Sequence, residues 1–390
     1  MPCAASIGTY LPCWGNARHR VPGDDEDAIT LAVEAGRAAL SAGGAVEKVV
    51  IVSRDLPLLE SSNAAVLLAG LSLDPELEVD ERLGGAPAAL DALSSARPRT
   101  LVIGVDVDPA GAAAVLTAEH GLRVRIAARI ARSLPVHTRN VFGESHDYGD
   151  PRLLLERGLV ASLEAAWVDT PAAVAGVDHA RARELCLQDP PALPTNGASS
   201  GLFALAAMAE KRRTGLLVAV EQASLSGLTV VGGAGRIHRC EPAAQPTPQR
   251  AFAAGADIPI SLAAYDRAFE AKVRWEAGKY VDNDELDFPP RYRVGDDGTL
   301  RTQYELVPLP RSGTVYTEVT VHIPVPGLRT PYSLVVVELD DIGVRALVKV
   351  TGAEPGTVKI GDRGRLVLRR VAVRSGVPDY GYAFEPRAAA

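Results

Sequence analysis

Cysteine is scarce in this sequence, and its copies lie far apart. Only four are present among 390 residues, and none forms a C-x-x-C pair: Cys3, Cys13, Cys186 and Cys240. A disulfide framework or a zinc ribbon needs more closely spaced thiols, so the sequence predicts neither. We expect a cytoplasmic protein whose thiols stay reduced.

Long apolar stretches are also missing. No run approaches the ~20 residues that span a bilayer, and the start, "MPCAASIGTYLPCWGN", lacks the basic residues and the long apolar segment of a secretory signal. We therefore expect no contact with a membrane. The formal net charge of −7 argues against a protein that coats nucleic acid. The length allows two or three domains.

Apolar runs and Ala-rich segments alternate in the first half of the chain. The stretch 24–44 predicts a helix with Asp25 as its N-cap, because acidic residues crowd the first turn and two glycines end it. A buried strand, "VEKVVIVS", follows. Further helices are expected in four segments: 61–71, 109–120, 151–167 and 198–210. Strands separated by such helices favour a largely parallel sheet with helices on both faces.

The C-terminal part has a different pattern. An amphipathic helix is expected at 261–277, and short strands with turn signals between them fit a small closed barrel of the OB type. We predict four regions: a first domain (1–240), a Pro/Ala-rich linker (241–260), a helix with a ribbon region (261–299) and the barrel (300–380).

Three segments of the first half share their pattern with a known family: "IGTYLPCWGNARHRVPGDDEDAITLAVEAGRAAL", "RTLVIGVDVDPAGAAAVLTAEHG" and "PTNGASSGLFALAAMAE". They resemble hydroxymethylglutaryl-CoA synthases of the archaeal kind, which belong to the thiolase superfamily. The resemblance implies an α/β fold with reduced αβαβα layers.

The C-terminal part resembles the DUF35 family. The motifs, in family order, are "RWEAGK", "PPR", "SGTVYTEVTV", "PYSLVVVELD" and "VKIGDRGRLVL". These acyl-CoA-associated proteins have a helix, a rubredoxin-like zinc ribbon and an OB-fold, and they typically partner thiolase-superfamily enzymes. The resemblance therefore implies a partner of that kind.

The stretch 78–93, "EVDERLGGAPAALDAL", predicts a strand–turn–helix elbow. In the thiolase superfamily the residue before the elbow helix is the acyl-accepting cysteine, whose thiolate the helix N-terminus stabilises. The resemblance places this position at Arg82, or at Glu81 if the register shifts by one. Since no cysteine lies between residues 14 and 185, we expect the covalent chemistry to be absent.

Two further catalytic positions of the family also hold other residues. The histidine position falls near Gly176, with His179 three residues further on, although a lone histidine near a helix start is more often a cap or a surface residue. The acid/base glutamate falls on Arg54, next to Asp55, where a surface salt bridge is the alternative interpretation.

Of the two remaining family features, the glycine-rich loop is matched only in part, whereas the asparagine is present. The glycine-rich loop that backs the oxyanion site corresponds to "EQASLSG", where only Gly227 offers comparable backbone freedom. Asn196, in "PTNGASSG", matches the family, but an Asn-Gly pair there is also a good turn.

The zinc ribbon has lost its ligands. The family places four cysteines between Gly278 and Gly298, whereas this stretch contains neither Cys nor His. Its acids lack the spacing of a calcium loop and predict a solvated acidic loop: Asp282, Asp284, Glu285 and Asp287. We predict no metal, and a ribbon that is either a metal-free hairpin or disordered.

These losses together favour a non-catalytic subunit. It would assemble with and support an active thiolase or ketosynthase-type enzyme, either a condensing enzyme or an acyltransferase, in a hetero-oligomer. Ala-rich helices such as "SSGLFALAAMAE" would supply the contacts. No cofactor is expected, although a coenzyme A thioester or an acyl carrier protein is a possible ligand.

Two alternatives remain open. An aldolase-like or synthase-like enzyme could make or break a carbon–carbon bond on an acyl-CoA without a covalent cysteine intermediate. The groups available for that chemistry are Asp178, His179, His146, Asp147 and Tyr148. The other alternative is a free-standing OB-fold binding protein, in which Tyr316 and Tyr332 could stack on bases, although the strands lack a regular aromatic and basic platform.

Overall fold

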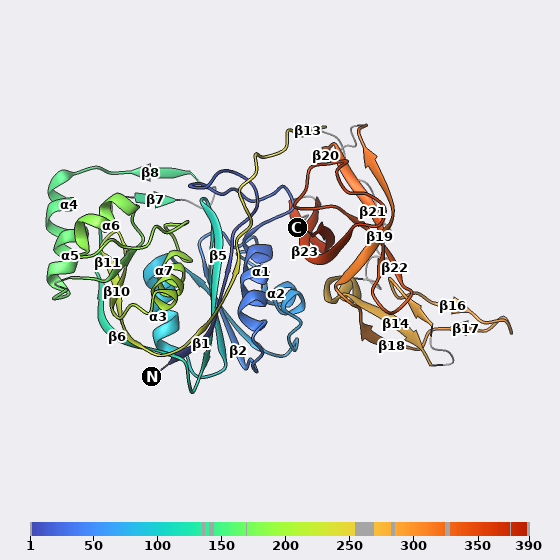
Figure 1. Ribbon diagram of the computed structural model, residues 1–390, viewed down its shortest axis with the longest axis horizontal. Helices are drawn as coiled ribbons and strands as arrows, with labels where there is room; N and C mark the ends of the chain where they lie inside the picture. Colours follow the sequence, from blue (N-terminus) through green and yellow to red (C-terminus); the bar gives the residue numbers. More distant parts are fainter. Residues whose placement is uncertain are drawn as a thin grey trace. The chain divides into compact units, whose positions relative to one another are not determined.

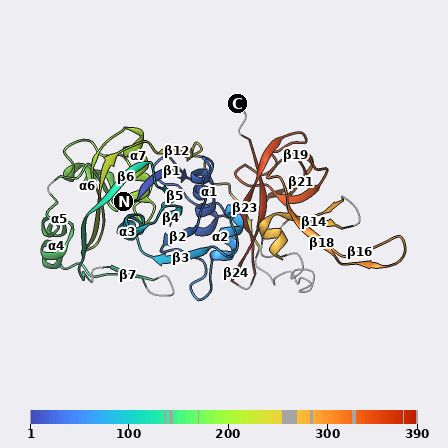
Figure 2. The same ribbon diagram turned by 90° about the horizontal axis from the view of Figure 1, so that it is seen from below.

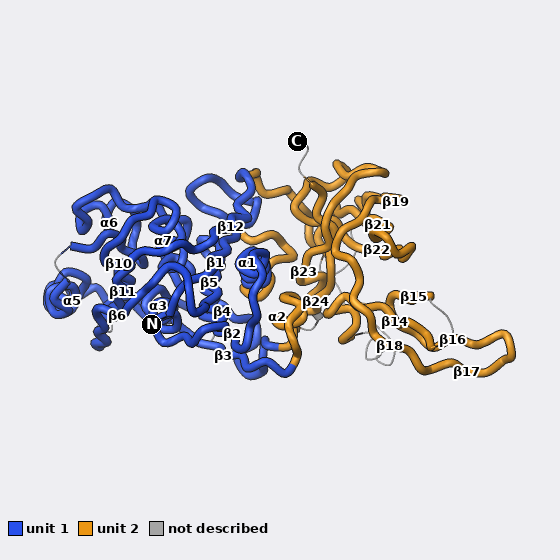
Figure 3. The backbone as a smooth tube through the Cα atoms, turned by 60° about the horizontal axis from the view of Figure 1, so that its bottom comes forward, with its two compact units in different colours: residues 1–21, 31–64, 76–244 blue, residues 22–30, 65–75, 245–390 orange. Residues whose placement is uncertain are grey.

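The structure is a computed structural model that describes residues 2–134, 137–139, 144–168, 170–253, 269–281, 285–323, 328–374 and 376–387. The chain divides into two compact units that interleave along the sequence (Figure 3). Unit 1 consists of residues 1–21, 31–64 and 76–244, and unit 2 of residues 22–30, 65–75 and 245–390.

Unit 1 is built on one mixed sheet of ten strands, in the order β3-β2-β4-β5-β1-β6-β11-β10-β9, with β12 paired to β1. Its strands are β1 (Cys3–Tyr10), β2 (Lys48–Ser53), β3 (Glu78–Leu83), β4 (Thr100–Val107), β5 (Ala110–Ala118), β6 (Leu122–Ala131), β9 (Ala173–Ala175), β10 (Gly215–Glu221), β11 (Ser224–Gly232) and β12 (Arg236–Cys240). A separate hairpin joins β7 (His137–Arg139) and β8 (Ser145–Asp147).

The helices of this unit form layers on and between the strands (Figures 1 and 2). They are α1 (Ala28–Leu40, from residue 31 on), α3 (Ala86–Ser95), α4 (Pro151–Arg157), α5 (Leu159–Ala165), α6 (His179–Leu185) and α7 (Ser200–Glu210). Helices α3 and α7 pack between strands β2, β4 and β5 on one side and β9, β10 and β11 on the other. Side chains of α5 and α6 cover the opposite face of the second group of strands.

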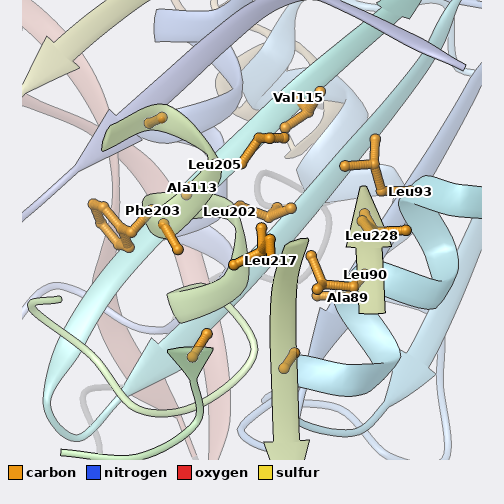
Figure 4. Close-up of a cluster of buried hydrophobic side chains, with 14 of the residues drawn as sticks. Ala89, Leu90, Leu93, Ala113, Val115, Leu202, Phe203, Leu205, Leu217 and Leu228 are labelled. Carbon is orange, nitrogen blue, oxygen red and sulfur yellow. The ribbon is translucent and has the colours of Figure 1, made fainter. Parts of the chain in front are cut away.

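The core of unit 1 lies around α3 and α7 (Figure 4). Leu90 and Leu93 of α3 and Leu202 and Phe203 of α7 are buried there. Many of the other positions on both helices are alanine or glycine, which lets the two helices approach strands on two sides. The layer order is αβαβα, as predicted.

Unit 2 contains a closed five-stranded barrel in the order β22-β21-β19-β23-β24. A bridge between Val350 and Phe384 joins its two ends. The barrel strands are β19 (Ser312–Val321), β21 (Tyr332–Leu339), β22 (Arg345–Lys349), β23 (Arg363–Arg374) and β24 (Val377–Pro386). Together with the layers of unit 1, the barrel confirms the predicted fold class.

Shorter elements complete unit 2. The strands are β13 (Ala251–Phe252), β14 (Glu276–Tyr280), β15 (Leu286–Asp287), β16 (Arg293–Val294), β17 (Leu300–Arg301), β18 (Tyr304–Pro308) and β20 (Arg329–Thr330). Most of helix α2 (Ala64–Leu71) also belongs here. Arg311 donates to the carbonyl oxygens of Gly70 (2.9 Å) and Ala69 (3.2 Å), so a cation satisfies the C-terminal end of α2.

Several expectations from the sequence were wrong. The Ala-rich segment 109–120 is strand β5 and not a helix, because the cores on its two sides bury it. The sheet is mixed, since β5, β1, β6 and β11 pair antiparallel. The N-cap of α1 is Asp27, whose carboxylate accepts from Ile29 and Thr30 (both 3.1 Å), and not Asp25.

Other expectations have mixed outcomes. The strand–turn–helix elbow at 78–93 is confirmed, as β3 followed by α3. Helix α7, which we expected to supply contacts with a partner, is almost entirely buried in the core of unit 1. Of the predicted helix 261–277, residues 269–274 are helical and β14 begins at Glu276, while 261–268 lie outside the described residues. No described helix is both long and apolar enough to cross a membrane.

We predict that Gly8→Ala destabilises unit 1. A Cβ at this position of β1 would lie 2.2 Å from the backbone nitrogen of Ala39 and 2.3 Å from the carbonyl oxygen of Ala35, both in α1. Overpacking against backbone should lower the free energy of unfolding by about 1–3 kcal/mol, measured by urea denaturation. Gly149→Ala, whose added Cβ would meet nothing within 4 Å, is the control. Equal stability of the two variants would contradict the tight packing of β1 on α1.

Candidate functional site

The elbow between β3 and α3 differs in register from the expectation. Arg82 lies inside β3, where its guanidinium is 3.4 Å from the Asp80 carboxylate. The two residues that precede α3 are Gly84 and Gly85, and Gly85 is the N-cap. The register differs because the strand continues to Leu83 before the chain turns. The residue at the start of the helix is therefore a glycine, which carries no nucleophile.

The N-terminus of α3 is occupied by a carboxylate from another strand. The Gly85 N–H donates to Oε2 of Glu221 at 3.0 Å, and Gly85 is buried. Glu221 is the last residue of β10, 136 residues further along the chain. The N-terminal end of a helix attracts negative charge because its first N–H groups lack partners within the helix. Glu221 thus fills an anion site with an internal anion.

An arginine balances the charge of this carboxylate. Arg54, which directly follows β2, forms an ion pair with Glu221. Arg139 donates to the Arg54 carbonyl oxygen at 2.7 Å and to the Asp55 carboxylate at 3.1 Å. Burial lowers the pKa of Arg54, but a guanidinium stays protonated at neutral pH. We call Arg54, Asp55, Gly85, Arg139 and Glu221 the Glu221 network.

A second carboxylate, which unlike that of Glu221 is buried, holds the start of α7. Asp106, near the end of β4, accepts from the N–H groups of Ala198 (2.7 Å) and Ser199 (2.9 Å) and from the Ser199 hydroxyl (2.5 Å). Gly197 is needed beside it, since a Cβ there would lie 1.9 Å from Asp106 Oδ1. Burial raises the pKa of Asp106, against the opposing effect of the hydrogen bonds from Ser199 and Ala198.

The structure brings the Asn196 and Gly176 positions of the family together. With the side-chain amide of Asn196 oriented so that its nitrogen faces acceptors, this nitrogen donates to the carbonyl oxygens of Val177 and Thr195, each at 3.1 Å. Gly176 follows β9 with φ of 89°, and a Cβ there would lie 2.0 Å from the carbonyl oxygen of Val220, the residue before Glu221. Asn196, the turn after β9 and the end of β10 therefore lie close together in unit 1.

The other sequence-predicted candidates are engaged elsewhere. Asp178 is the N-cap of α6 and accepts from the Arg181 N–H at 2.8 Å. His179 is exposed, and its Nε2 lies 3.2 Å from the carbonyl oxygen of Pro190. The structure therefore gives Asp178 a capping position.

The candidates on β8 lie on an exposed hairpin. Asp147 is 2.5 Å from Nδ1 of His137 on β7. His146 and Tyr148 are exposed next to it. Gln222 of the β10–β11 turn donates to the His137 carbonyl oxygen at 3.1 Å.

The segment expected to form the oxyanion loop is a tight hairpin. Residues Glu221 and Ser224 pair at its end, and Gly227 lies inside β11 opposite Val218. A glycine-rich loop with free N–H groups is therefore not formed at this place.

Charged side chains occupy the ribbon region. Asp287, which is 5% exposed, accepts from Arg293 (2.6 and 2.5 Å), from Arg291 (3.3 Å for both bonds) and from the Tyr280 hydroxyl (3.2 Å). Burial acts against the Asp287 charge, but the bonds from Arg293 and Arg291 outweigh it and lower the pKa. Glu285 pairs with Arg293. Asp282 and Asp284 lie outside the described residues.

The described part of the chain contains no group of three or more His, Cys, Asp or Glu side chains that could hold a metal ion. The acidic residue that remains buried in the ribbon region, Asp287, is paired with arginines and not with other ligands.

Comparison with known families identifies the barrel. Residues 306–369 match the family of ChsH2 C-terminal OB-fold domains. The barrel is therefore an OB-fold that is similar to these domains. This match confirms the resemblance of the C-terminal part, and it covers the strands from β19 to most of β23. No curated protein sequence matches the chain.

Solved structures of condensing enzymes are similar to part of the chain. For 3-oxoacyl-(acyl-carrier-protein) synthase III from Aquifex aeolicus, the identity is 17%, the TM-score is 0.45, and the match covers 59% of this chain and 99% of the other. A variant of OleA from Xanthomonas campestris is 14% identical with a TM-score of 0.47, and the match covers 58% of this chain and 98% of OleA. The tetronic acid condensing enzyme AbyA1 is 18% identical with a TM-score of 0.45, and the match covers 59% of this chain and 100% of AbyA1.

Sequence reasoning missed Glu221 and Asp106. Glu221 opens the segment "EQASLSG", which was expected to form the oxyanion loop. Its position at a strand end gave no indication that it reaches the start of α3. Asp106 stands in a run of apolar residues, "LVIGVDV", where a lone acid before a turn was the only signal. Both carboxylates contact residues that are 92 to 136 positions away.

We predict that Asp106→Ala destabilises unit 1 more than Ser199→Ala does. Removing the carboxylate leaves the Ala198 and Ser199 N–H groups buried without an acceptor, which should cost about 3 kcal/mol. Ser199→Ala leaves both N–H groups paired with Asp106 and removes only the bonds of the hydroxyl to Asp106 and to Thr195, which should cost about 1–2 kcal/mol. Urea denaturation followed by circular dichroism measures both. A loss for Asp106→Ala no larger than for Ser199→Ala would show that this carboxylate does not hold the start of α7.

Proposed function

We propose that this protein is a non-catalytic subunit that assembles with and supports an active condensing enzyme or acyltransferase. The partner would handle acyl-CoA or carrier-bound acyl groups. The observation that carries the proposal is the occupation of the α3 N-terminus by Glu221, where the resemblance to the thiolase superfamily implies the acyl-accepting thiolate.

Acyl transfer through an enzyme-bound intermediate needs a nucleophile and an open site for the developing negative charge. At the start of α3 the N-cap is Gly85, which has no nucleophilic side chain, and its N–H already donates to Glu221. A carboxylate there repels a second anion, and its ion pair with Arg54 holds it in place. This geometry supports a protein that has kept the fold but does not carry out acyl transfer through an enzyme-bound intermediate.

An exposed apolar surface supports the assembly part of the proposal. None of the seven residues of α4 is buried, and such a short helix is unstable unless other parts pack on it. Five large apolar side chains are exposed on or near α4 to α6, with exposed fractions of 47 to 92%: Leu154, Leu155, Val160, Trp167 and Leu187. A contiguous patch of exposed apolar side chains marks a protein interface, and we propose that these five form such a patch.

The proposal can be tested by acylation of the chain. Incubated with a short-chain acyl-CoA, the full chain should show no acyl mass increment in intact-mass spectrometry. Cys186→Ala and Cys240→Ala control for stray thiols, because both cysteines are only partly buried. An increment on the wild type that survives both substitutions would overturn the proposal.

A designed variant tests whether Glu221 blocks acylation at the start of α3. In Gly85→Cys a Cβ would lie 2.5 Å from Glu221 Oε2, so the carboxylate should hinder the new thiol. Gly85→Cys combined with Glu221→Ala should become acylated faster than Gly85→Cys alone. Equal rates would show that Glu221 does not block the helix end.

Assembly with a partner can be tested directly. An intact condensing enzyme encoded next to this protein should co-purify with the tagged full chain and lose activity or solubility in its absence. Leu155→Ser combined with Trp167→Ser should abolish co-purification, because it removes apolar area from the exposed surface. Glu156→Ser, on the same helix, is the matched control and should leave co-purification unchanged.

Enzymatic activity of the isolated protein would count against the subunit function. Turnover of a β-hydroxyacyl-CoA or β-ketoacyl-CoA by the isolated protein, abolished by His179→Ala, would establish the aldolase-like alternative instead.

A further inference from the structure

Unit 2 contains a cavity of about 510 Å³ on the OB-fold domain. Its walls come from the segment with Asp24 and Asp25, from the paired strands β13 and β20, and from the adjoining ends of β21, β22 and β23. The volume lies in the range of small-molecule sites in proteins. The cavity is distinct from the Glu221 network, which belongs to unit 1.

The lining of this cavity carries an excess of positive charge. The lining includes two carboxylates, those of Asp24 and Asp25. It also includes four cationic side chains: Arg250, Arg329, Lys349 and Arg370. The chain as a whole has a formal net charge of −7, so this is a local reversal of sign. Clustered guanidinium and ammonium groups in a concave site attract anions, and phosphate above all.

Internal contacts hold these cations in fixed positions. The Asp24 carboxylate lies 3.2 Å from Nε of Arg329 and 3.6 Å from Nη1 of Arg250. Arg370 donates through Nη2 to the Asp24 carbonyl oxygen at 3.1 Å. Lys349 donates to the Val371 carbonyl oxygen at 2.9 Å. A binding site whose charged groups are already oriented loses less entropy when a ligand binds.

Two aromatic rings line the same cavity. Phe252 of β13 is 60% exposed, although a phenylalanine gains from burial. Tyr332 opens β21, and Nζ of Lys349 lies 5.5 Å from the centre of its ring. Exposed rings beside cations are a common platform for a nucleobase, because every base can stack through its face.

The acidic wall of the cavity is anchored to the barrel. The Tyr380 hydroxyl donates to Asp27 at 2.7 Å, and the buried Arg369 lies 3.5 Å from Glu26. The Arg370 N–H also donates to the Asp25 carbonyl oxygen at 2.8 Å. The segment 22–30 is therefore a fixed part of unit 2, and the cavity is a built feature of this unit.

We propose that this cavity binds a nucleotide. The phosphates would contact Arg329, Arg250, Lys349 and Arg370, and the base would stack on Phe252 or Tyr332. A free nucleotide and the nucleotide portion of coenzyme A share this chemistry. The inference goes beyond the proposed function, since the cavity would bind a nucleotide whether or not the chain assembles with an enzyme.

Calorimetric titration of the full chain with ADP, coenzyme A and adenosine tests the proposal. ADP or coenzyme A should bind, adenosine should bind at least about tenfold more weakly, and binding should weaken as salt is raised. Tighter binding of coenzyme A than of ADP assigns the site to the coenzyme. Equal or tighter binding of ADP assigns it to free nucleotides.

Variants locate the binding in this cavity. Arg329→Gln should raise the Kd for ADP about tenfold or more, because it removes a charge-assisted contact to phosphate. Tyr332→Leu should raise it about tenfold through lost stacking. Arg345→Gln is the matched control, since Arg345 is similarly exposed and paired with Glu338 but does not line the cavity.

Four results would overturn the proposal. They are no binding of ADP or coenzyme A at millimolar concentration, adenosine binding as tightly as ADP, and an Arg345→Gln effect equal to that of Arg329→Gln. The fourth is an oligothymidylate that binds more tightly than ADP with an affinity that rises with length, which would make this surface a single-strand binding face.

Discussion

Helices α3 and α7 begin inside unit 1, where the first N–H groups of a helix need an acceptor and water is scarce. Gly85 at the start of α3 and Ser199 at the start of α7 are both buried. Since an unpaired buried N–H costs about as much as a lost hydrogen bond, each helix start must find an acceptor in the protein. Strand ends supply both: Glu221 of β10 for α3 and Asp106 of β4 for α7.

This constraint links packing to function. The middle layer can be buried because α3 and α7 carry small side chains, and burial in turn forces the helix starts to meet the strand ends. A helix start at such a junction is a natural place for an anionic intermediate. In this chain an internal carboxylate paired with Arg54 takes that place. Unit 1 therefore satisfies the start of α3 with its own side chains, and the proposed subunit function rests on this contact.

Charge pairs also stabilise unit 2. In the ribbon region, to which the DUF35 resemblance assigns a metal, Arg291 and Arg293 pair with the buried Asp287. On the OB-fold domain, by contrast, the cations around Asp24 outnumber the carboxylates. The same residue types thus stabilise one region and leave the other with a net positive charge that suits an anionic ligand.

The sequence by itself determined the elements with strong local signals and the lack of a cysteine near the elbow. The elbow at 78–93, the barrel strands and the absence of cysteine between residues 14 and 185 follow from turn residues, from alternation and from composition. Tertiary structure decided the rest. Alanine favours a helix, yet 110–118 is a strand because partners on both sides bury it. The contact of Glu221 with Gly85 and the inclusion of residues 22–30 in unit 2 depend on parts of the chain more than a hundred positions apart. No local pattern encodes such pairings, because their free energy exists only once the layers have formed.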